Sequence, residues 1–231
     1  MRNTDKISIK AAIFDMDGTL VDTLGSWKEV FSGLGERFLC DSGFTPDMDV
    51  DRMCRTMTIA EGMRLVRERH FPSADERSVI DSAMELFVKY YKEKATLKDG
   101  VRELLDTFLA RGVRMALATA SPMLFVNIAL DRFGLRGYFD EIISCEEVGR
   151  NKEFPDVFIE ARKRLGAELP RTWVFEDSLT AIKTAARAGF NTVGIFDKYN
   201  FGCEEASRIA TEYIKEGDSL ARLIPLLEID N

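Results

Sequence analysis

The chain has 231 residues, of which 45% are hydrophobic, and a formal net charge of −7. This length accommodates one large domain, or a core domain with a modest insertion, and the hydrophobic fraction is that of an ordinary globular protein. The acidic balance argues against nucleic acid or a membrane as partner, and the absence of a membrane-spanning run or signal-peptide core in the sequence favours a cytoplasmic protein.

The cysteine and histidine content limits the metals that the chain could bind. The four cysteines (Cys40, Cys54, Cys145 and Cys203) are scattered, which favours a reduced protein with unpaired thiols. A multi-histidine zinc site is excluded because His70 is the only histidine. Any metal must therefore be held mainly by oxygen ligands, which select hard cations such as Mg²⁺.

The first predicted element is a buried strand that ends in a polar loop. Residues 11–14 are apolar, and Asp15, Asp17, Gly18 and Thr19 follow them closely. Aspartate is rare inside strands, so the chain has reached the C-terminal edge of a strand, where open α/β sheets bind ligands. Two carboxylates and free backbone amides are the groups that phosphoryl transfer through an aspartyl-phosphate requires.

The region after this loop is predicted to be helical. Apolar residues recur there at helical spacing, and both Thr58–Glu61 and Ser73–Glu76 have the pattern of a capping box. No convincing strand is found between residues 23 and 97. An insert at this point of the chain would lie over the reactive edge of the sheet as a lid.

Strand and helix signals alternate from about residue 99 onwards. Strands are predicted over residues 113–118, 141–145, 172–175 and 191–196, and near 213–214. Intervening helices are predicted to begin at Val101, at Ser121 with Pro122 in the first turn, at Pro155 and at Ser178, and a final helix follows the last strand. This repetition indicates a parallel sheet with helices on both faces.

The elements together predict an α/β protein with a Rossmann-like parallel sheet core and an inserted all-helical cap domain. The core would comprise residues 1–22 and 98–231, and the cap residues 23–97.

Polar residues follow four of the predicted strands. They are Asp15 with Asp17, Thr119, Lys152, and Glu176 with Asp177. The carboxyl ends of parallel strands share one edge of a sheet, so we expect these side chains to meet there. Carboxylates that converge repel one another, and a lysine with a divalent cation would offset that repulsion. The cluster therefore implies a bound, magnesium-like metal.

Four motifs, in this order, resemble those of the haloacid dehalogenase-like superfamily. They are residues 15–22 (DMDGTLVD), 117–119 (LAT), 152–156 (KEFPD) and 174–178 (VFEDS). The helical insert after the first motif is similar to that superfamily's C1-type cap, which places the chain in subfamily I. The pattern is closest to the subgroup that contains β-phosphoglucomutase and phosphoglycolate phosphatase.

The resemblance implies roles for the acidic residues. Asp15 would be the nucleophile, and Asp17 would protonate the leaving oxygen and then deprotonate the attacking water. Mg²⁺ would bind Asp15, the main-chain carbonyl of Asp17, Asp177 and Glu176, the last directly or through water. A true dehalogenase lacks an acid at the position of Asp17, because a halide leaves without a proton, so Asp17 argues for phosphoester chemistry.

The resemblance also implies residues that hold the substrate. Thr119 and Lys152 would hold the phosphoryl oxygens, while Gly18 and Thr19 would let the backbone fold close around the phosphate. Ala120 is a further substrate-binding candidate.

In the cap, Arg52, Arg55 and Arg64 would contact a second anionic group of the substrate, or would be solvated arginines on helix faces. Arg55 is the candidate that we retain. Trp27 would line the cleft or pack in the core of the cap.

Three functions remain open from the sequence. The leading one is a Mg²⁺-dependent phosphatase of a small phosphorylated metabolite. A β-phosphoglucomutase-like hexose-phosphate mutase is the alternative, because residues 118–121 (ATAS) are close to the corresponding stretch of those enzymes, although the cap lacks their Lys-Gly-x-Ser-Arg segment. The third is a non-catalytic regulator that binds a phosphometabolite. The sequence does not indicate an oligomeric state.

Overall fold

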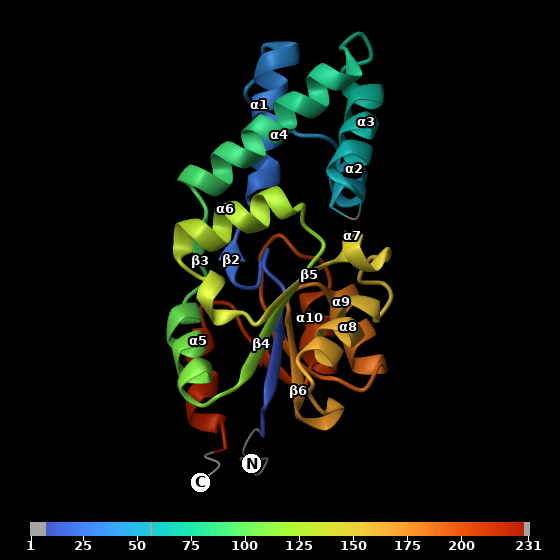
Figure 1. Ribbon diagram of the computed structural model, residues 1–231. Helices are drawn as coiled ribbons and strands as arrows, with labels where there is room; N and C mark the ends of the chain where they lie inside the picture. The colour runs from blue at the N-terminus through green and yellow to red at the C-terminus, as the bar shows by residue number, and fades with distance from the viewer. Residues whose placement is uncertain (1–7, 56, 229–231) are drawn as a thin grey trace. The chain divides into compact units, whose positions relative to one another are not determined.

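The computed structural model describes residues 8–55 and 57–228, which form two compact units. The core unit runs to Leu24 and resumes at Thr96, and the inserted unit is Gly25–Ala95. Figure 1 shows the helices and strands of both units. In the part of the chain that the structure describes, no helix is long and apolar enough to cross a membrane.

A six-stranded parallel sheet forms the centre of the core unit. Its strands are β1 (Ala11–Phe14), β4 (Arg114–Thr119), β5 (Glu141–Ser144), β6 (Thr172–Glu176), β7 (Asn191–Ile195) and β8 (Glu212–Ile214). They lie in the order β5-β4-β1-β6-β7-β8, so β1 is a central strand between β4 and β6. The predicted α/β class with a Rossmann-like parallel sheet is confirmed.

Helices cover both faces of this sheet (Figure 1). The helices of the core unit are α5 (Val101–Ala110), α6 (Met123–Phe133), α7 (Cys145–Val148), α8 (Asp156–Arg164), α9 (Leu179–Arg187) and α10 (Cys203–Ile209), with 3₁₀ turns at Arg136–Tyr138, Leu169–Arg171 and Leu220–Leu226. Ile13 and Val174 belong to the buried cluster that includes residues of α8 and α9. Their neighbours Phe14 and Phe175 stack with ring centroids 4.4 Å apart and contact Phe108 of α5. Successive strand residues thus bury opposite faces, which explains the continuous apolar runs.

A short antiparallel pair of strands lies where the insert leaves the core unit. In this pair β2 (Val21–Asp22) lies against β3 (Thr96–Leu97), with Asp22 opposite Thr96. The sequence predicts no strand between residues 23 and 97, which is wrong at β3. Two residues are too few to show the alternation that marks a strand.

The described part of the inserted unit is helical, with α1 (Ser26–Leu39), α2 (Met48–Cys54), α3 (Ile59–His70) and α4 (Glu76–Glu93). The capping box predicted at Thr58 is present at the start of α3. The one predicted at Ser73 is wrong, because Asp75 is the N-cap of α4 and accepts the backbone N–H of Ser78 at 2.8 Å. Asp75 directly precedes the helix and is as strong an N-cap residue as serine.

Other element ends also differ from the predictions. Pro122, not Ser121, is the N-cap of α6, which leaves the Ser121 hydroxyl available to the site described below. The strand predicted over residues 141–145, which is β5, ends at Ser144 because Cys145 begins α7. The predicted final helix is a 3₁₀ helix at Leu220–Leu226, and α10 was not foreseen.

Candidate active site

The carboxyl ends of three neighbouring strands bring the motif residues to one edge of the sheet. Thr119 is the last residue of β4 and Glu176 is the last residue of β6, on either side of β1. Asp15 follows β1 directly, and its backbone N–H donates to the carbonyl of Phe175 at 2.9 Å. Asp15 therefore lies beside the end of β6, as the sequence predicts.

A buried carboxylate cluster consists of Asp15, Glu176 and Asp177, with one oxygen of each within 4.8 Å of the others. Lys152 Nζ donates to Asp15 Oδ1 and, at 2.5 Å, to Glu176 Oε1. The lysine side chain is only 11% exposed, so these ion pairs are shielded from solvent. Three carboxylates less one ammonium leave two negative charges when all the groups are ionised.

The surplus negative charge affects the titration of the cluster. Burial raises the pKa of Glu176 to about 7, against the opposing effect of Lys152. Burial, with the charges of Glu176 and Asp15, raises the pKa of Asp177 well above its ordinary value. Burial alone would lower the pKa of Lys152, but the charges of Asp15 and Glu176 outweigh it and the pKa is raised. A bound cation would favour the ionised form of these carboxyl groups and so oppose the effect of burial.

The donor set of the cluster fits a divalent metal. It offers carboxylate oxygens only, all on buried residues, and hard divalent cations prefer such ligands. The two surplus negative charges match the charge of one divalent ion. The cluster is thus able to hold a divalent metal in the core unit.

Asp177 is held in position by hydrogen bonds to both of its carboxylate oxygens. Thr19 Oγ1 donates to Asp177 Oδ1 at 3.0 Å, and Asn200 Nδ2 donates to Oδ2. Gly18 packs against the same carboxylate with a φ of +83°, and a Cβ at this position would lie 2.2 Å from Asp177 Oδ2. Gly18 is therefore required both by the backbone conformation and by the close approach. The Thr19 residue is fully buried and its hydroxyl contacts Asp177. Contact of the Gly18 and Thr19 backbone with a phosphate stays a prediction.

Asp17 is held by two hydroxyl groups. Thr23 Oγ1 donates to Asp17 Oδ1 at 2.6 Å, and Ser121 Oγ donates to Asp17 Oδ2. The backbone N–H of Ser121 donates in turn to Thr119 Oγ1 at 3.0 Å. Ser121 thus connects the second predicted motif with the second aspartate of the first.

Three residues that contact the predicted site were missed by the sequence analysis: Thr23, Ser121 and Asn200. Ser121 was interpreted as a helix cap, although its position two residues after Thr119 could have indicated the site. Thr23 and Asn200 belong to no motif that marks them, and only the folded chain brings them to Asp17 and Asp177.

Two of the predicted substrate-binding residues are not joined to the carboxylate cluster by a described contact. Ala120 is exposed in the bend that follows β4. Arg55 belongs to the inserted unit, where its Nε donates to Asp51 at 3.0 Å and its guanidinium carbon lies 6.0 Å from the centre of the Trp27 ring. Trp27 itself packs against Phe87, with ring centroids 5.0 Å apart. Contact of Ala120 and Arg55 with a substrate stays a prediction.

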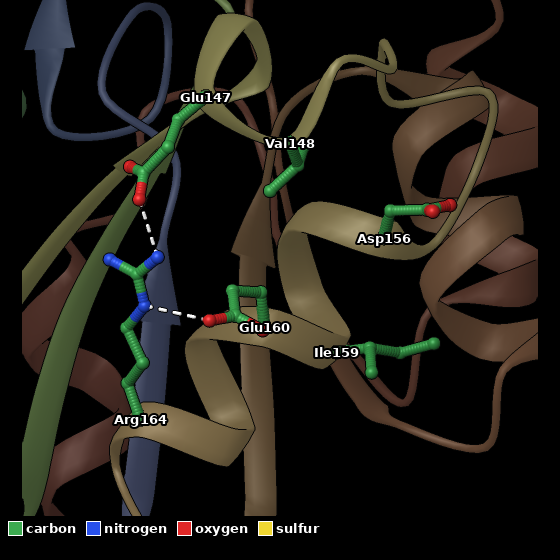
Figure 2. A pocket seen from close by; sticks show the side chains of 6 residues that line it. All are labelled: Glu147, Val148, Asp156, Ile159, Glu160 and Arg164. Atoms are coloured by element: carbon green, nitrogen blue, oxygen red, sulfur yellow. Dashed lines mark hydrogen bonds and ion pairs between the residues drawn. The ribbon is translucent and has the colours of Figure 1, made fainter.

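The core unit also has a groove of about 460 Å³ between α7 and α8. Its lining residues are Glu147, Val148, Asp156, Ile159, Glu160 and Arg164 (Figure 2). Figure 2 shows Arg164 donating to both Glu147 and Glu160, so three of the charged groups of the groove pair with one another. The fourth, Asp156, lies 3.9 Å from Arg150, which is not part of the lining. None of these six residues is a predicted site residue, and the carboxylate cluster lies at the sheet edge instead.

A family model described as haloacid dehalogenase-like hydrolase matches residues 9–189, which include all four motifs. The chain belongs to the haloacid dehalogenase-like hydrolase family. The predicted family and enzyme class are therefore confirmed.

Two named relatives and one solved structure are similar to this chain over most of their length. A phosphorylated carbohydrates phosphatase of Thermotoga maritima is 27% identical over 199 residues, which cover 84% of this chain and 88% of the relative. A phosphoglycolate phosphatase of Pseudomonas syringae pv. tomato is 28% identical over 230 residues, which cover 96% and 81%. A crystal structure of a Thermotoga maritima protein, provisionally named a β-phosphoglucomutase, matches with a TM-score of 0.79 and 26% identity, over 95% of this chain and 100% of the other.

Proposed function

We propose that the protein is a Mg²⁺-dependent phosphatase that hydrolyses a small-molecule phosphomonoester through an aspartyl-phosphate on Asp15. The observation that carries this proposal is the pairing of Asp15 with Lys152 inside a buried carboxylate cluster, beside a second aspartate held by hydroxyls. The relatives are named as phosphatases of phosphorylated carbohydrates and of phosphoglycolate, so the substrate class that we propose is a small phosphorylated sugar or acid.

Asp15 would supply the nucleophilic oxygen. Its carboxylate attacks phosphorus, a bond forms between the Asp15 oxygen and phosphorus, and the bond from phosphorus to the substrate oxygen breaks. Lys152 stays beside Asp15, and together with Thr119 it would offset negative charge on the phosphoryl oxygens. Mg²⁺ bound by Asp15, Asp177, Glu176 and the Asp17 carbonyl would add positive charge beside those oxygens.

Asp17 would move the protons. It gives a proton to the departing alcohol oxygen, and in the second step it takes a proton from the water that attacks the aspartyl-phosphate. Thr23 and Ser121 donate to its two oxygens, which fixes the orientation of the carboxylate.

Substitution Asp17→Asn is expected to lower kcat by about 10²- to 10⁴-fold and to leave substrate affinity nearly unchanged, because proton transfer is needed only along the reaction path. Steady-state kinetics gives kcat. Calorimetry gives the affinity of the variant for the phosphomonoester, which the slow variant leaves intact during the titration. Unchanged turnover in the Asp17→Asn variant would show that another group moves the protons.

Magnesium is expected to stabilise the protein more at pH 8 than at pH 6. The pKa of Glu176 is raised to about 7 and that of Asp177 is also raised, so the folded protein binds more protons than the unfolded chain between those pKa values and the ordinary carboxyl range. The metal-free protein therefore loses stability as the pH rises through this window. Mg²⁺ must displace the protons, so it binds more weakly at pH 6.

Thermal unfolding with excess Mg²⁺ and with a chelator, at pH 6 and pH 8, checks this expectation. The chelated protein should have the higher Tm at pH 6, and the increase in Tm on adding Mg²⁺ should be larger at pH 8. An equal increase at both pH values would mean that the metal does not bind at the titrating carboxylates.

The proposed reaction is tested by a panel of sugar phosphates, phosphoglycolate and an aryl phosphate, each with Mg²⁺ and with a chelator. Borohydride added during turnover reduces an aspartyl-phosphate to homoserine, which mass spectrometry locates in the sequence. We expect metal-dependent release of phosphate and homoserine at position 15. Hydrolysis without modification of Asp15, or hydrolysis that a chelator leaves unchanged, would overturn the proposal.

A hexose-phosphate mutase is the second candidate, because the matched Thermotoga maritima structure carries a provisional β-phosphoglucomutase name. The same panel separates the two functions. A mutase isomerises a hexose phosphate only after priming by its bisphosphate, whereas a phosphatase releases inorganic phosphate. Binding without turnover across the panel would favour the third function, a non-catalytic regulator.

A further inference from the structure

The loop between β7 and α10 is connected to the carboxylate cluster through one side chain. Asn200 lies in this loop, and its amide Nδ2 donates to Asp177 Oδ2. The other Asp177 oxygen is occupied by Thr19, from the loop after β1. Asp177 is thus fixed between two segments that are far apart in sequence, and only one of them belongs to a recognised motif.

Asp197 organises the loop that carries Asn200. Its backbone carbonyl accepts the N–H of Asn200 at 3.1 Å, and its Oδ1 accepts the N–H of Tyr199 at 2.9 Å. Its Oδ2 forms an ion pair with Lys98 Nζ at 2.6 Å, and the Asp197 side chain is only 2% exposed. The short turn that presents Asn200 is therefore built on a buried, paired carboxylate.

Lys98 connects both sides of Asp177. Its ammonium group holds Asp197 at the base of the Asn200 loop. Its backbone N–H donates at 2.9 Å to the carbonyl of Leu20, which follows Thr19 in the chain. One residue thus anchors the two segments whose side chains donate to the two oxygens of Asp177.

We propose that Asn200 is a positioning residue of the metal site, held in place by the Lys98–Asp197 ion pair, and that it sets the affinity of the carboxylate cluster for Mg²⁺. This inference rests on the metal dependence in the proposed function. It assigns to the β7–α10 loop a role that none of the four motifs covers.

The physical reason is the cost of keeping Asp177 correctly oriented. The hydrogen bonds from Thr19 and Asn200 hold its two carboxylate oxygens in place. Without the amide of Asn200, the carboxylate can rotate away from the orientation that binds the metal. Hydrogen-bond partners that orient metal ligands in this way typically change metal affinity by about 10- to 100-fold when they are removed.

The test is the binding of Mg²⁺ alone, measured by calorimetry on the full chain at pH 8. Asn200→Ala is expected to weaken Mg²⁺ binding by about 10-fold or more. Asn191→Ala is the matched control, since Asn191 lies at the opposite end of β7 and its amide donates to the Pro170 carbonyl at 2.9 Å. The control is expected to bind Mg²⁺ within about twofold of the unmodified protein.

A second variant removes the anchor and keeps Asn200. Lys98→Met combined with Asp197→Asn replaces the ion pair by neutral groups, so no unpaired charge is left buried. We expect this double variant to weaken Mg²⁺ binding as well. Adding Asn200→Ala to the double variant should weaken Mg²⁺ binding by less than the two separate effects combined. The reason is that both changes act through the same contact with Asp177.

The outcomes distinguish this inference from the proposed function. If the unmodified protein binds Mg²⁺ and both the Asn200→Ala variant and the anchor variant bind it equally well, the positioning role is wrong and the proposed function stands. If the unmodified protein binds no Mg²⁺, both are wrong. Circular dichroism identifies a variant that fails to fold, and the Mg²⁺ affinity of the other variant then decides whether the positioning role holds.

Discussion

Asp15→Asn is expected to lower kcat by at least about 10⁴-fold, the scale on which removal of a nucleophile acts. The amide has the shape of the carboxylate but cannot attack phosphorus to form the aspartyl-phosphate. The fold should not suffer, because Asp15 is one of two acids that share Lys152, and the lysine keeps its bond to Glu176. In the presence of a chelator we expect the Tm of the variant to be no lower than that of the unmodified protein, since one source of repulsion in the cluster is gone.

Phosphate release and thermal unfolding measure the two parts of this expectation. Asp131→Asn is the matched control, because Asp131 lies on α6 and makes an exposed ion pair with Arg136. The control should retain full activity. Substantial turnover in the Asp15→Asn variant, with phosphate still released at saturating substrate, would exclude Asp15 as the nucleophile.

Gly18→Ala is expected to weaken Mg²⁺ binding by about 10- to 100-fold and to reduce kcat/KM accordingly. A methyl group at this position would lie 2.2 Å from Asp177 Oδ2, which is too close for any real contact. The carboxylate cannot move away without losing the hydrogen bonds from Thr19 and Asn200. The positive φ adds a further cost of about 1–2 kcal/mol to folding.

Gly112→Ala separates the backbone cost from the displacement of Asp177. Gly112 also has a positive φ, of +67°, but a Cβ there would meet nothing within 4 Å. Both variants should lose stability, while only Gly18→Ala should lose affinity for Mg²⁺ in a calorimetric titration. Equal Mg²⁺ affinity in the two variants would show that Asp177 is not a ligand.

Much of the core unit could be predicted because its local signals agree with its tertiary structure. The strand at residues 11–14 is fully apolar and ends at an aspartate, and the structure places that end beside β4 and β6. The rule that parallel strands present their carboxyl ends at one edge was sufficient to expect Asp15, Lys152, Glu176 and Asp177 together, which the contacts of Lys152 and the cluster bear out.

The parts that could not be predicted depend on contacts across long stretches of sequence. The hydrogen bond of Asn200 to Asp177 spans 23 residues, and that of Ser121 to Asp17 spans 104. A loop asparagine or a serine before a proline carries no periodicity that marks such a role, and the serine had a plausible local explanation as a helix cap. Strand β3 was missed for a different reason, since its two residues are too few to show the alternation that marks a strand.

The β2–β3 pair has a consequence for how such a chain can diversify. Because Asp22 and Thr96 lie opposite one another, the inserted unit leaves the core unit and rejoins it at the same point. The entropy of closing a loop there grows only slowly with its length, by about 0.6 kcal/mol per doubling. Exchange of the inserted unit at this point would leave the carboxylate cluster of the core unit in place. Recombination could thus supply a different insert without rebuilding the core unit.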